Sequence, residues 1–562
     1  MADRTASRVL LVYPRFGADS FWNYQAACQV VGARYSAAPL GLITVAALLP
    51  RDWPVRLIDR NVDELRDADL DWADLVMTGG MLPQQRDTLR IVSQAHARGR
   101  PVVVGGPDVT ASPSRYAQAD FQVVGEAEEV MAEFLRAWSS GARRGRFVAR
   151  DFPDITRSPV PRFELLNLRR YMHVGVQHSR GCPFHCEFCN VVELNGHVPR
   201  LKTAEQMLAE LDALHALGYR GHVDVVDDNF IGDRRRIKVF LPQLIAWMKR
   251  RRHPFTFSTE ASLNLADDDE LMDLLRDAGF FAIFVGIETP DAATLVQTRK
   301  RQNTNRDIGE SIRRIYRRGI FVNAGFIIGL DGETGRVAEP MIACIEETGI
   351  PVCMVGLLYA LPGTALSRRL AAEGRLHADS DTLASDADLD QCTSGLNFIP
   401  LRPRAEILAD YRAVLRAIYS TEAYFGRVRR VARALDLRGH RLRRPLRQTL
   451  RDLRSFARLI WSSGVRDREV RGAFWRTVFD CVRHNPRALH YLASQAILYL
   501  HLKPYTGRLD TRLAEQLAEA HLQAVLEPVP AGEVVADPVS AVLGNDRGPR
   551  FERERLSDAS VV

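Results

Sequence analysis

Three closely spaced cysteines are the side chains in this chain best suited to inorganic chemistry. Cys182, Cys186 and Cys189 fall within the segment RGCPFHCEFC, whereas the other five of the eight cysteines are scattered. Thiolates are soft ligands that hold zinc and iron–sulfur clusters. We therefore predict a metal site formed by these three cysteines, and we interpret the scattered ones as small buried residues.

The number of thiols discriminates between kinds of metal site. A structural zinc site usually closes with four ligands, often as two Cys-x-x-Cys pairs, and the second pair is missing here. His185 could supply a fourth ligand, but it lies between two of the thiols, where the geometry for a tetrahedron is poor. A ferredoxin-type cluster also takes four cysteines. A [4Fe–4S] cluster held by three leaves one iron without a protein ligand, and such an open iron is a site for a substrate.

The region from 171 to 400, which must position these thiols, has an α/β pattern. The cysteine loop follows the β-rich segment VGVQHS and precedes the helical segment TAEQMLAELDALHALG, whose expected N-cap is Thr203. Five more β-rich segments follow, namely HVDVVDDN, FTFSTEA, FAIFVGIE, FVNAGFIIGL and VCMVGLLYAL. Six βα units predict a partial (β/α)6 or TIM-like barrel with its chemistry at the carboxyl ends of the strands.

The region from 1 to 140 predicts a second α/β domain. Five apolar segments, RVLLVYP, VRLIDR, DLVMTGG, PVVVGG and FQVVGE, alternate with helical stretches. Strands that are apolar on both faces need helices on both sides, so we expect a doubly wound, Rossmann-like sheet. A ligand of such a sheet binds at the loops that leave the strands' carboxyl ends. The segment 141–170, rich in Arg, Gly and Pro, is predicted to be a linker.

Composition limits the remaining possibilities. The chain has 562 residues, 46% hydrophobic and 26% charged, which predicts two or three globular domains and excludes a wholly disordered protein. The N-terminus is predicted to be a first strand and not a signal peptide, and no apolar stretch is long enough to span a bilayer, so we expect a cytoplasmic protein. The net charge of +7 is concentrated toward the C-terminus, with eleven Arg and two Asp from Arg427 to Arg454. Residues 401–526 are predicted to be helical and basic, and 527–562 to be a disordered tail.

The cysteine loop resembles the cluster motif of the radical S-adenosylmethionine (SAM) enzymes, with Phe188 just before the third cysteine and Ser-Arg-Gly before the first. The resemblance implies that Cys182, Cys186 and Cys189 are catalytic. In that family SAM chelates the open iron, an electron from the cluster splits the sulfonium, and a 5′-deoxyadenosyl radical abstracts a hydrogen atom. The cofactor carries the hard chemistry and the protein positions it.

Segments at other predicted strand ends are similar to the SAM-binding motifs of the same family. The resemblance implies contacts of VDDNFIG with the methionine ammonium, of GIETP or STEAS with the ribose, and of GFIIGLDGET with the adenine. Carboxylates suit an ammonium. For each carboxylate a structural role, such as capping a helix, remains the alternative. The implied SAM-binding residues are Phe188, Asp227, Asp228, Asn229, Glu260, Glu288, Gly325 and Gly329.

The N-terminal region is similar to the cobalamin (B12)-binding domain that is often fused ahead of a radical SAM barrel. The matching segments are PLGLITVAALL, DLVMTGG, VVVGGPDVT and VVGEAEE. Loops that contain glycine can approach a bulky corrin closely. The alternative is a domain that has kept the fold and lost the ligand. The implied cobalamin-binding residues are Thr78, Gly79, Gly80, Met81, Gly105, Gly106, Gly125 and Glu126.

One segment departs from the cobalamin-binding pattern. Domains that ligate cobalt with a histidine carry Asp-x-His-x-x-Gly after the first strand, whereas this chain has RFGADSFWNY there. We therefore expect cobalamin, a probable cofactor by the resemblance, to bind without a histidine ligand. Met81 and Leu82 are both candidates to face the cobalt.

Together the two resemblances imply a cobalamin-dependent radical SAM enzyme of the group that includes hopanoid and bacteriochlorophyll C-methylases. The implied reaction is methylation of an unactivated carbon of a lipid or secondary metabolite. One alternative is rearrangement, cyclisation or oxidation without methyl transfer, and another is a sensor of cluster and cobalamin that performs no catalysis. We expect a small-molecule or lipid substrate, an electron donor such as flavodoxin or ferredoxin, and no nucleic acid. The basic C-terminal helices suggest a lid over the barrel or peripheral contact with an anionic membrane, with a solvated helix face as the alternative.

Overall fold

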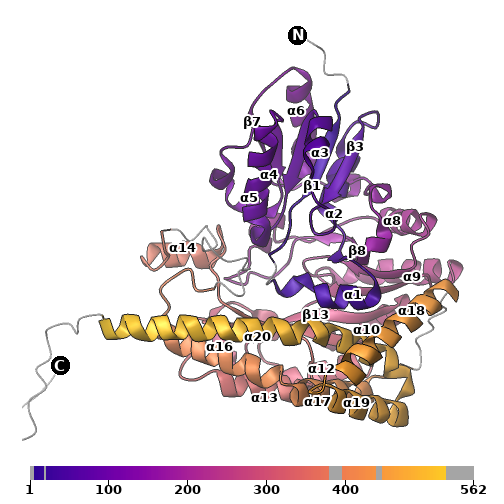
Figure 1. Cartoon of the computed structure of the whole chain (residues 1–562), viewed down its shortest axis with the longest axis vertical. Coiled ribbons are helices and arrows are strands. Elements are labelled where there is room, and N and C mark those ends of the chain that lie inside the picture. The colour runs from indigo at the N-terminus through magenta and orange to yellow at the C-terminus, as the bar shows by residue number, and fades with distance from the viewer. Residues whose placement is uncertain (1–5, 18–19, 379–394, 438–445, 527–562) are drawn as a thin grey trace, which may run out of the picture.

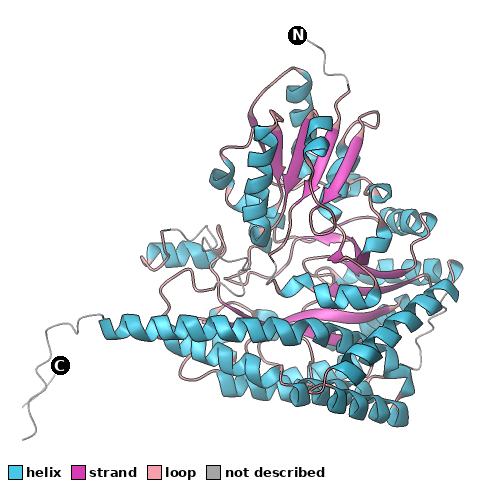
Figure 2. Cartoon of the chain, viewed as in Figure 1, coloured by secondary structure: helices cyan, strands magenta, loops and turns pink. Residues whose placement is uncertain are grey.

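A computed structural model describes residues 6–17, 20–378, 395–437 and 446–526 of the chain. The N-terminal α/β domain sits above a curled sheet, and long helices from the C-terminal region lie across that sheet (Figure 1). Figure 2 shows the two sheets as separate groups of strands, each flanked by helices. The predicted tail 527–562 lies outside the described residues.

The N-terminal domain is a parallel sheet of six strands in the order β3-β1-β4-β5-β6-β7. Its strands and helices are β1 (Val9–Tyr13), β3 (Val55–Asp59), β4 (Leu75–Gly79), β5 (Val102–Gly105), β6 (Phe121–Val124), β7 (Gly145–Val148), α2 (Leu40–Leu48), α3 (Asp67–Trp72), α4 (Gln85–Ala97), α5 (Pro107–Ala111) and α6 (Ala127–Ser139). Alternate residues of β1 enter opposite cores. Val9 and Leu11 pack toward α2 and α6, and Leu10 and Val12 pack toward α3, α4 and α5. The sheet is therefore covered on both faces, as the apolar segments predict.

The second sheet is an open, parallel half-barrel with the strand order β15-β14-β13-β12-β11-β8-β2. The strands are β2 (Tyr35–Ala37), β8 (Tyr171–Val176), β11 (Gly221–Val225), β12 (Phe255–Glu260), β13 (Phe280–Glu288), β14 (Phe321–Ile328) and β15 (Cys353–Leu357). Helices α8 (Ala204–Ala216), α9 (Arg234–Arg250), α10 (Asp269–Ala278), α12 (Ile308–Tyr316) and α13 (Ala338–Thr348) follow its strands. The six strands predicted for this region are all present.

Two strands of these large sheets fall outside the sequence-based expectations. β7 lies in the segment predicted as a linker and pairs with β6, extending the N-terminal sheet. β2 comes from the N-terminal region but pairs with β8 of the half-barrel, through Tyr35 opposite Tyr171. Each is a short edge strand, and so few residues carry no clear period of hydrophobicity.

Helices of the C-terminal region pack against the half-barrel. They are α16 (Arg404–Ile418), α17 (Thr421–Ala434), α18 (Leu446–Leu459), the π-helical turn Ile460–Arg466, α19 (Arg471–His484) and α20 (Leu489–Leu526). Helix α20 contacts α16 and also α1 (Gln25–Val31), which itself contacts α18 (Figure 1). Because α1, α18 and α20 come together over the sheet, they enclose the space inside it. No helix in the described part of the chain combines the length and apolarity that crossing a membrane requires.

Candidate active site

The cysteine loop runs from the short strand β9 (Ser179–Arg180) to helix α7 (Val191–Asn195). Gly181 begins it with a φ of +94°, and a Cβ there would lie 2.8 Å from the carbonyl oxygen of Gly196. Only glycine combines this conformation with so close an approach. The loop brings Cys182, Cys186 and Cys189 to the carboxyl end of β8, and all three thiols are free of disulfides. No three His, Cys, Asp or Glu side chains in the described ranges are gathered as a single-ion site would require.

Amide side chains point at two of the sulfurs. Asn229 Nδ2 lies 3.9 Å from Cys182 Sγ, and Gln302 Nε2 lies 3.6 Å from Cys186 Sγ. Burial raises the pKa of Cys189 to about 12, so the positive charge of a metal is needed to hold it as a thiolate. Hydrogen bonds to sulfur are a usual feature around iron–sulfur clusters. The donor set therefore fits the predicted cluster.

The two predicted aspartates brace the cysteine loop. Asp227 is buried and accepts hydrogen bonds from the backbone N–H of His178 and the hydroxyl of Ser179, at 2.7 and 2.5 Å. Burial raises the pKa of Asp227 to about 7. Asp228 accepts from the backbone N–H of Gly181 at 2.8 Å. Both carboxylates thus hold the backbone just before Cys182, and their contact with the methionine ammonium stays a prediction.

An irregularity in the strand pairing sets the direction of the Glu288 side chain. The register of β13 against β14 shifts between Gly286 and Glu288, and Glu288 has a φ of +69°. Such an irregularity re-aims a side chain at a strand end. Glu288 Oε1 meets Lys300 Nζ at 2.6 Å, and that ammonium lies 5.9 Å from the ring centre of Phe188. Lys300 was not predicted from the sequence, where the basic run RKR after GIETP was the available signal.

The predicted glycines of β14 allow close packing. A Cβ on Gly325 would lie 3.2 Å from the Phe284 ring. Gly329 has a φ of +99°, and its N–H donates to both carboxylate oxygens of Glu333, at 3.0 and 3.1 Å. The role predicted for Gly325 and Gly329 beside the adenine stays a prediction.

The glycine loops of the N-terminal domain lie side by side at the carboxyl ends of β4, β5 and β6. A Cβ on Gly79 would lie 1.9 Å from the carbonyl oxygen of Gly105, so the two strand ends tolerate no side chain there. Gly106 and Gly125 have φ values of +95° and +90°. The buried hydroxyl of Thr78 has no hydrogen-bond partner among the described residues. An unpartnered polar atom beside bare backbone fits a bound cofactor such as cobalamin.

Of the other residues predicted to contact cobalamin, Met81 is 45% exposed and follows Gly80 into the loop. Glu126 instead forms ion pairs with Arg180 and Arg200 of the half-barrel. Arg180 directly precedes the cysteine loop. The loops of the two domains therefore face each other, which is the arrangement that cobalamin and SAM would need to share one substrate.

A cavity of about 690 Å³ lies inside the half-barrel, between its strands and helices α18 and α20. Glu260 lines its upper end, two residues before Ser262, whose backbone N–H donates to Asn229. Glu260 is open to the cavity yet enclosed by protein, and this enclosure, together with the Asp224, Asp228 and Asp227 carboxylates, raises its pKa to about 8. Aromatic and aliphatic side chains make up much of the rest of the wall, among them Phe21, Trp22, Phe281, Phe284, Phe321, Phe456, Ile497 and Leu498. The volume and the apolar wall are typical of a small-molecule site.

Three family models match the chain, namely the B12 binding domain over residues 29–135, the radical SAM superfamily over 176–344 and a domain of unknown function, DUF4070, over 364–515. An uncharacterized methyltransferase of Synechocystis sp. is 40% identical over 515 residues, which cover 91% of this chain and 94% of that relative. The hopanoid C-2 methylase of Rhodopseudomonas palustris is 36% identical over 482 residues, covering 84% of this chain and 89% of that relative.

Solved structures share the fold. The cobalamin-dependent SAM radical enzyme OxsB, with aqua-cobalamin and SAM bound, has a TM-score of 0.57 at 14% identity and covers 94% of this chain and 82% of its own. The radical SAM methyltransferase TsrM from Kitasatospora setae, with tryptophan and a SAM analogue bound, has a TM-score of 0.51 at 19% identity and covers 65% and 76%.

Proposed function

The chain belongs to the cobalamin-dependent radical SAM enzymes, and we propose that it methylates an unactivated carbon of an apolar, lipid-like substrate held in the cavity of the half-barrel. The cluster supplies the electron that splits SAM, and cobalamin supplies a carrier for the methyl group. One SAM would be cleaved to methionine and a 5′-deoxyadenosyl fragment, which would become 5′-deoxyadenosine by taking the substrate's hydrogen atom. A second SAM would give up its methyl group and leave as S-adenosylhomocysteine. An external donor such as flavodoxin or ferredoxin would supply the electrons.

The residues of this chain have separate tasks in that reaction. Cys182, Cys186 and Cys189 would hold the cluster, and the amides of Asn229 and Gln302 would stabilise two of the sulfurs. Lys300 places a positive charge near the thiols, since its ammonium lies 5.9 Å from the ring centre of Phe188, the residue before Cys189. Burial acts to lower the pKa of Lys300, but Glu288 and the Cys186 and Cys189 thiols raise it. The apolar wall would exclude water from a substrate radical.

The observation that carries the proposal is the short path from the cavity to the cysteine loop. Glu260 lines the cavity two residues before Ser262, and Ser262 is hydrogen-bonded to Asn229, whose amide also points at Cys182. A substrate in this cavity would therefore lie next to the place where SAM is cleaved. Relatives named as methyltransferases, including a hopanoid methylase, support an apolar polycyclic lipid as the substrate class.

Anaerobic reconstitution tests the proposal. Enzyme with iron, sulfide, cobalamin, SAM and dithionite should release 5′-deoxyadenosine, and Cys186→Ala should release none. Cys344→Ala is the matched control, since that half-buried thiol lies on α13 away from the loop. Lipid extracts of cells with and without the protein should differ by products one CH₂ heavier. With that substrate, 5′-deoxyadenosine and S-adenosylhomocysteine should form in comparable amounts; 5′-deoxyadenosine alone would contradict methylation.

We also propose that the helices beside the cavity rest on an anionic membrane. Leu453 of α18 lines the cavity and is 59% exposed, and Trp461 in the following π-helical turn is 63% exposed. Arginines are interspersed with these apolar side chains, including Arg454, Arg458 and Arg466. Exposed apolar residues combined with arginine on one helix favour binding to an anionic lipid surface. A lipid could then enter the cavity next to α18.

Vesicle flotation tests this membrane contact. The wild type should float with vesicles that contain anionic lipid and should float less with neutral vesicles. The double variant Leu453→Ser with Trp461→Ser should lose most of the binding. Val239→Ser is the control, because Val239 is 67% exposed on α9, at the outside of the half-barrel. Equal flotation of both variants would contradict the assignment of this surface.

A further inference from the structure

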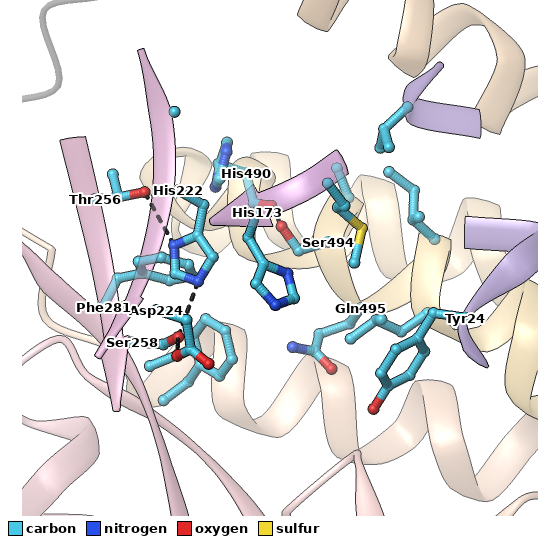
Figure 3. Close-up of a pocket in the computed structure, with 18 of the residues that line it drawn as sticks. Tyr24, His173, His222, Asp224, Thr256, Ser258, Phe281, His490, Ser494 and Gln495 are labelled. Atoms are coloured by element: carbon cyan, nitrogen blue, oxygen red, sulfur yellow. Dashed lines mark hydrogen bonds between the residues drawn. The ribbon is translucent and has the colours of Figure 1, made fainter. Parts of the chain in front are cut away.

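Polar side chains gather at the inner end of the otherwise apolar cavity. They come from β8, β11 and β12 and, across the cavity, from α20; Figure 3 shows His173, His222, Asp224, Ser258 and Gln495 around the same space. None of them contacts the cysteine loop in the described structure, and the reaction proposed above gives them no task. Their placement in the wall of the substrate cavity makes them candidates for recognising the substrate.

Three of these side chains form a directed chain of hydrogen bonds. The Ser258 hydroxyl donates to Asp224 Oδ1 and accepts from His222 Nε2 at 2.8 Å. Burial lowers the pKa of His222 to about 3, so its imidazole is neutral. With Nε2 carrying the proton, the order of donation runs from His222 through Ser258 to Asp224. The chain fixes the Asp224 carboxylate and leaves its second oxygen as an acceptor without a partner among the described residues.

Two further side chains are held in place but have unused hydrogen-bonding capacity. Gln495 is fully buried, and its Oε1 accepts from the hydroxyl of Tyr424 at 3.5 Å. Its Nε2 has no partner in the described parts of the structure. The ring centre of His173 lies 5.8 Å from that of His222, and the His173 imidazole has no hydrogen-bond partner within those same parts. Figure 3 shows the Gln495 amide and the His173 ring directed into the space between the strands and α20.

A buried donor left unpaired costs on the order of 1–3 kcal/mol, so a native site that keeps one usually has a ligand for it. A hydrocarbon would satisfy neither Gln495 nor Asp224. An ammonium could donate to Asp224 but could not accept from Gln495. A carboxylate or phosphate would need a cation in the wall. Arg220 is the one guanidinium among the described cavity residues, and it already donates to the backbone carbonyls of His215 and Tyr219. A hydroxyl group both donates and accepts.

We infer that the cavity binds a hydroxyl-bearing apolar molecule, with the hydroxyl donating to Asp224 and accepting from Gln495 Nε2, and with His173 beside them. This inference rests on the proposed function, because it assigns the substrate class of the same cavity. Ser258 lies two residues before Glu260 on β12, which is about 7 Å along a strand. The hydroxyl is therefore bound about 7 Å deeper than the level of Glu260, so it orients the substrate without taking part in the reaction.

A matched pair of ligands tests the inference. The probes are a hopane-skeleton hydrocarbon and the same skeleton with a single tertiary hydroxyl, offered from detergent micelles to the reconstituted holoenzyme, with the bound probe measured by mass spectrometry. The wild type should bind the hydroxylated probe roughly tenfold more tightly, the effect of about one buried hydrogen bond. Gln495→Leu, close in size but apolar, should remove this preference.

Ser494→Ala is the control, because Ser494 also lines the cavity but its hydroxyl donates to the His490 carbonyl of its own helix. It should keep the preference. Equal binding of both probes by the wild type, or a preference that survives Gln495→Leu, would show that these groups hold only water. Failure of both probes to bind would also overturn the inference. Release of 5′-deoxyadenosine without substrate, measured on the same samples, separates these outcomes from failure of the proposed radical chemistry.

If the hydroxylated probe is a substrate, Gln495→Leu should raise KM by a similar factor and leave kcat nearly unchanged. A loss of binding that is equal for the bound substrate and its transition state is the signature of a group that contacts the substrate away from the reacting carbon. A variant that was merely misfolded would instead lose basal 5′-deoxyadenosine release as well.

Discussion

Arg180 Nη2 lies 2.8 Å from Glu128 Oε1, and this contact joins the cysteine loop to the N-terminal domain. Arg180 directly precedes Gly181 and Cys182, and Glu128 is in the first turn of α6, just past the last glycine loop of the domain. Arg180 also pairs with Glu126, which in turn pairs with Arg200. The side chains of Arg180 and Glu128 are 13% and 10% exposed. The two cofactor-binding regions are therefore held in one orientation by a nearly buried ionic network.

Breaking that network should destabilise the protein. Arg180→Ala leaves Glu126 and Glu128 with uncompensated buried charge and should lower the free energy of unfolding by about 3 kcal/mol. Arg476→Ala, which removes an exposed ion pair with Glu422, should change it by less than about 0.5 kcal/mol. Urea unfolding of both variants checks this. Similar, small effects of both would mean that the Arg180 pairs contribute no more than surface pairs do.

Gly79→Ala should damage the cobalamin site. The added methyl would overlap the Gly105 carbonyl oxygen, 1.9 Å away, and neither backbone can move freely inside a sheet. We expect a loss of about 3 kcal/mol in unfolding free energy, together with loss of bound cobalamin. Gly41→Ala is the control: no atom lies within 4 Å of the new methyl, so helix α2 should be stabilised by up to about 1 kcal/mol. Cobalamin that is retained by Gly79→Ala, seen by its visible absorbance, would argue against these loops as the site.

Asp59 gives stability a defined dependence on pH. It accepts hydrogen bonds from the Asn61 backbone N–H and the Tyr171 hydroxyl, and burial raises its pKa from 3.8 to about 6. Between pH 3.8 and about 6 the native state keeps a proton that the unfolded chain releases, so the free energy of unfolding should fall as pH rises through this window. Asp59→Asn has no such proton. Asp227 and Glu260, whose pKa values are also raised, contribute the same fall to both proteins. Urea titrations across the window should therefore show a steeper fall in the wild type than in Asp59→Asn, and parallel curves would contradict the assignment.

Lys300 should tune the cluster's reduction potential. Its ammonium is paired with Glu288 and lies beside the thiols of Cys186 and Cys189. Lys300→Met leaves the Glu288 charge unopposed next to the cluster, which disfavours added electrons and should lower the midpoint potential. Adding Glu288→Gln restores neutrality, so the double variant should return toward the wild-type value. A potentiometric titration followed by electron paramagnetic resonance measures the midpoint potentials of the single and double variants. Unchanged potentials would show that the Lys300 charge does not act on the cluster.

Much of the architecture could be predicted from local patterns. Runs such as VVVGG and VLLVY are apolar at every position, which favours parallel strands buried on both faces, and the structure confirms both parallel sheets. Thr203 caps α8 as expected, because its hydroxyl oxygen accepts from the Gln206 N–H. The three cysteines are close in sequence, so their spacing alone indicated a cluster. Each of these features depends on residues that are close in the sequence, within about one helical turn or one strand.

The inner cavity could not be predicted in this way, because its residues meet only in the folded chain. His222, Ser258 and Asp224 are neighbours through the parallel register of β11 and β12, and each looks like an ordinary strand residue in its own segment. Gln495 reaches them from α20, across the open side of the half-barrel. Lys300 and Glu288 meet because β13 breaks its register at the strand end. The sequence by itself determined the two parallel sheets through local hydrophobicity, and it determined the cofactors through the cysteine spacing together with the resemblance to the radical SAM and cobalamin-binding families. Only tertiary packing decided which polar groups face the substrate, since strand register and helix crossing bring distant segments together.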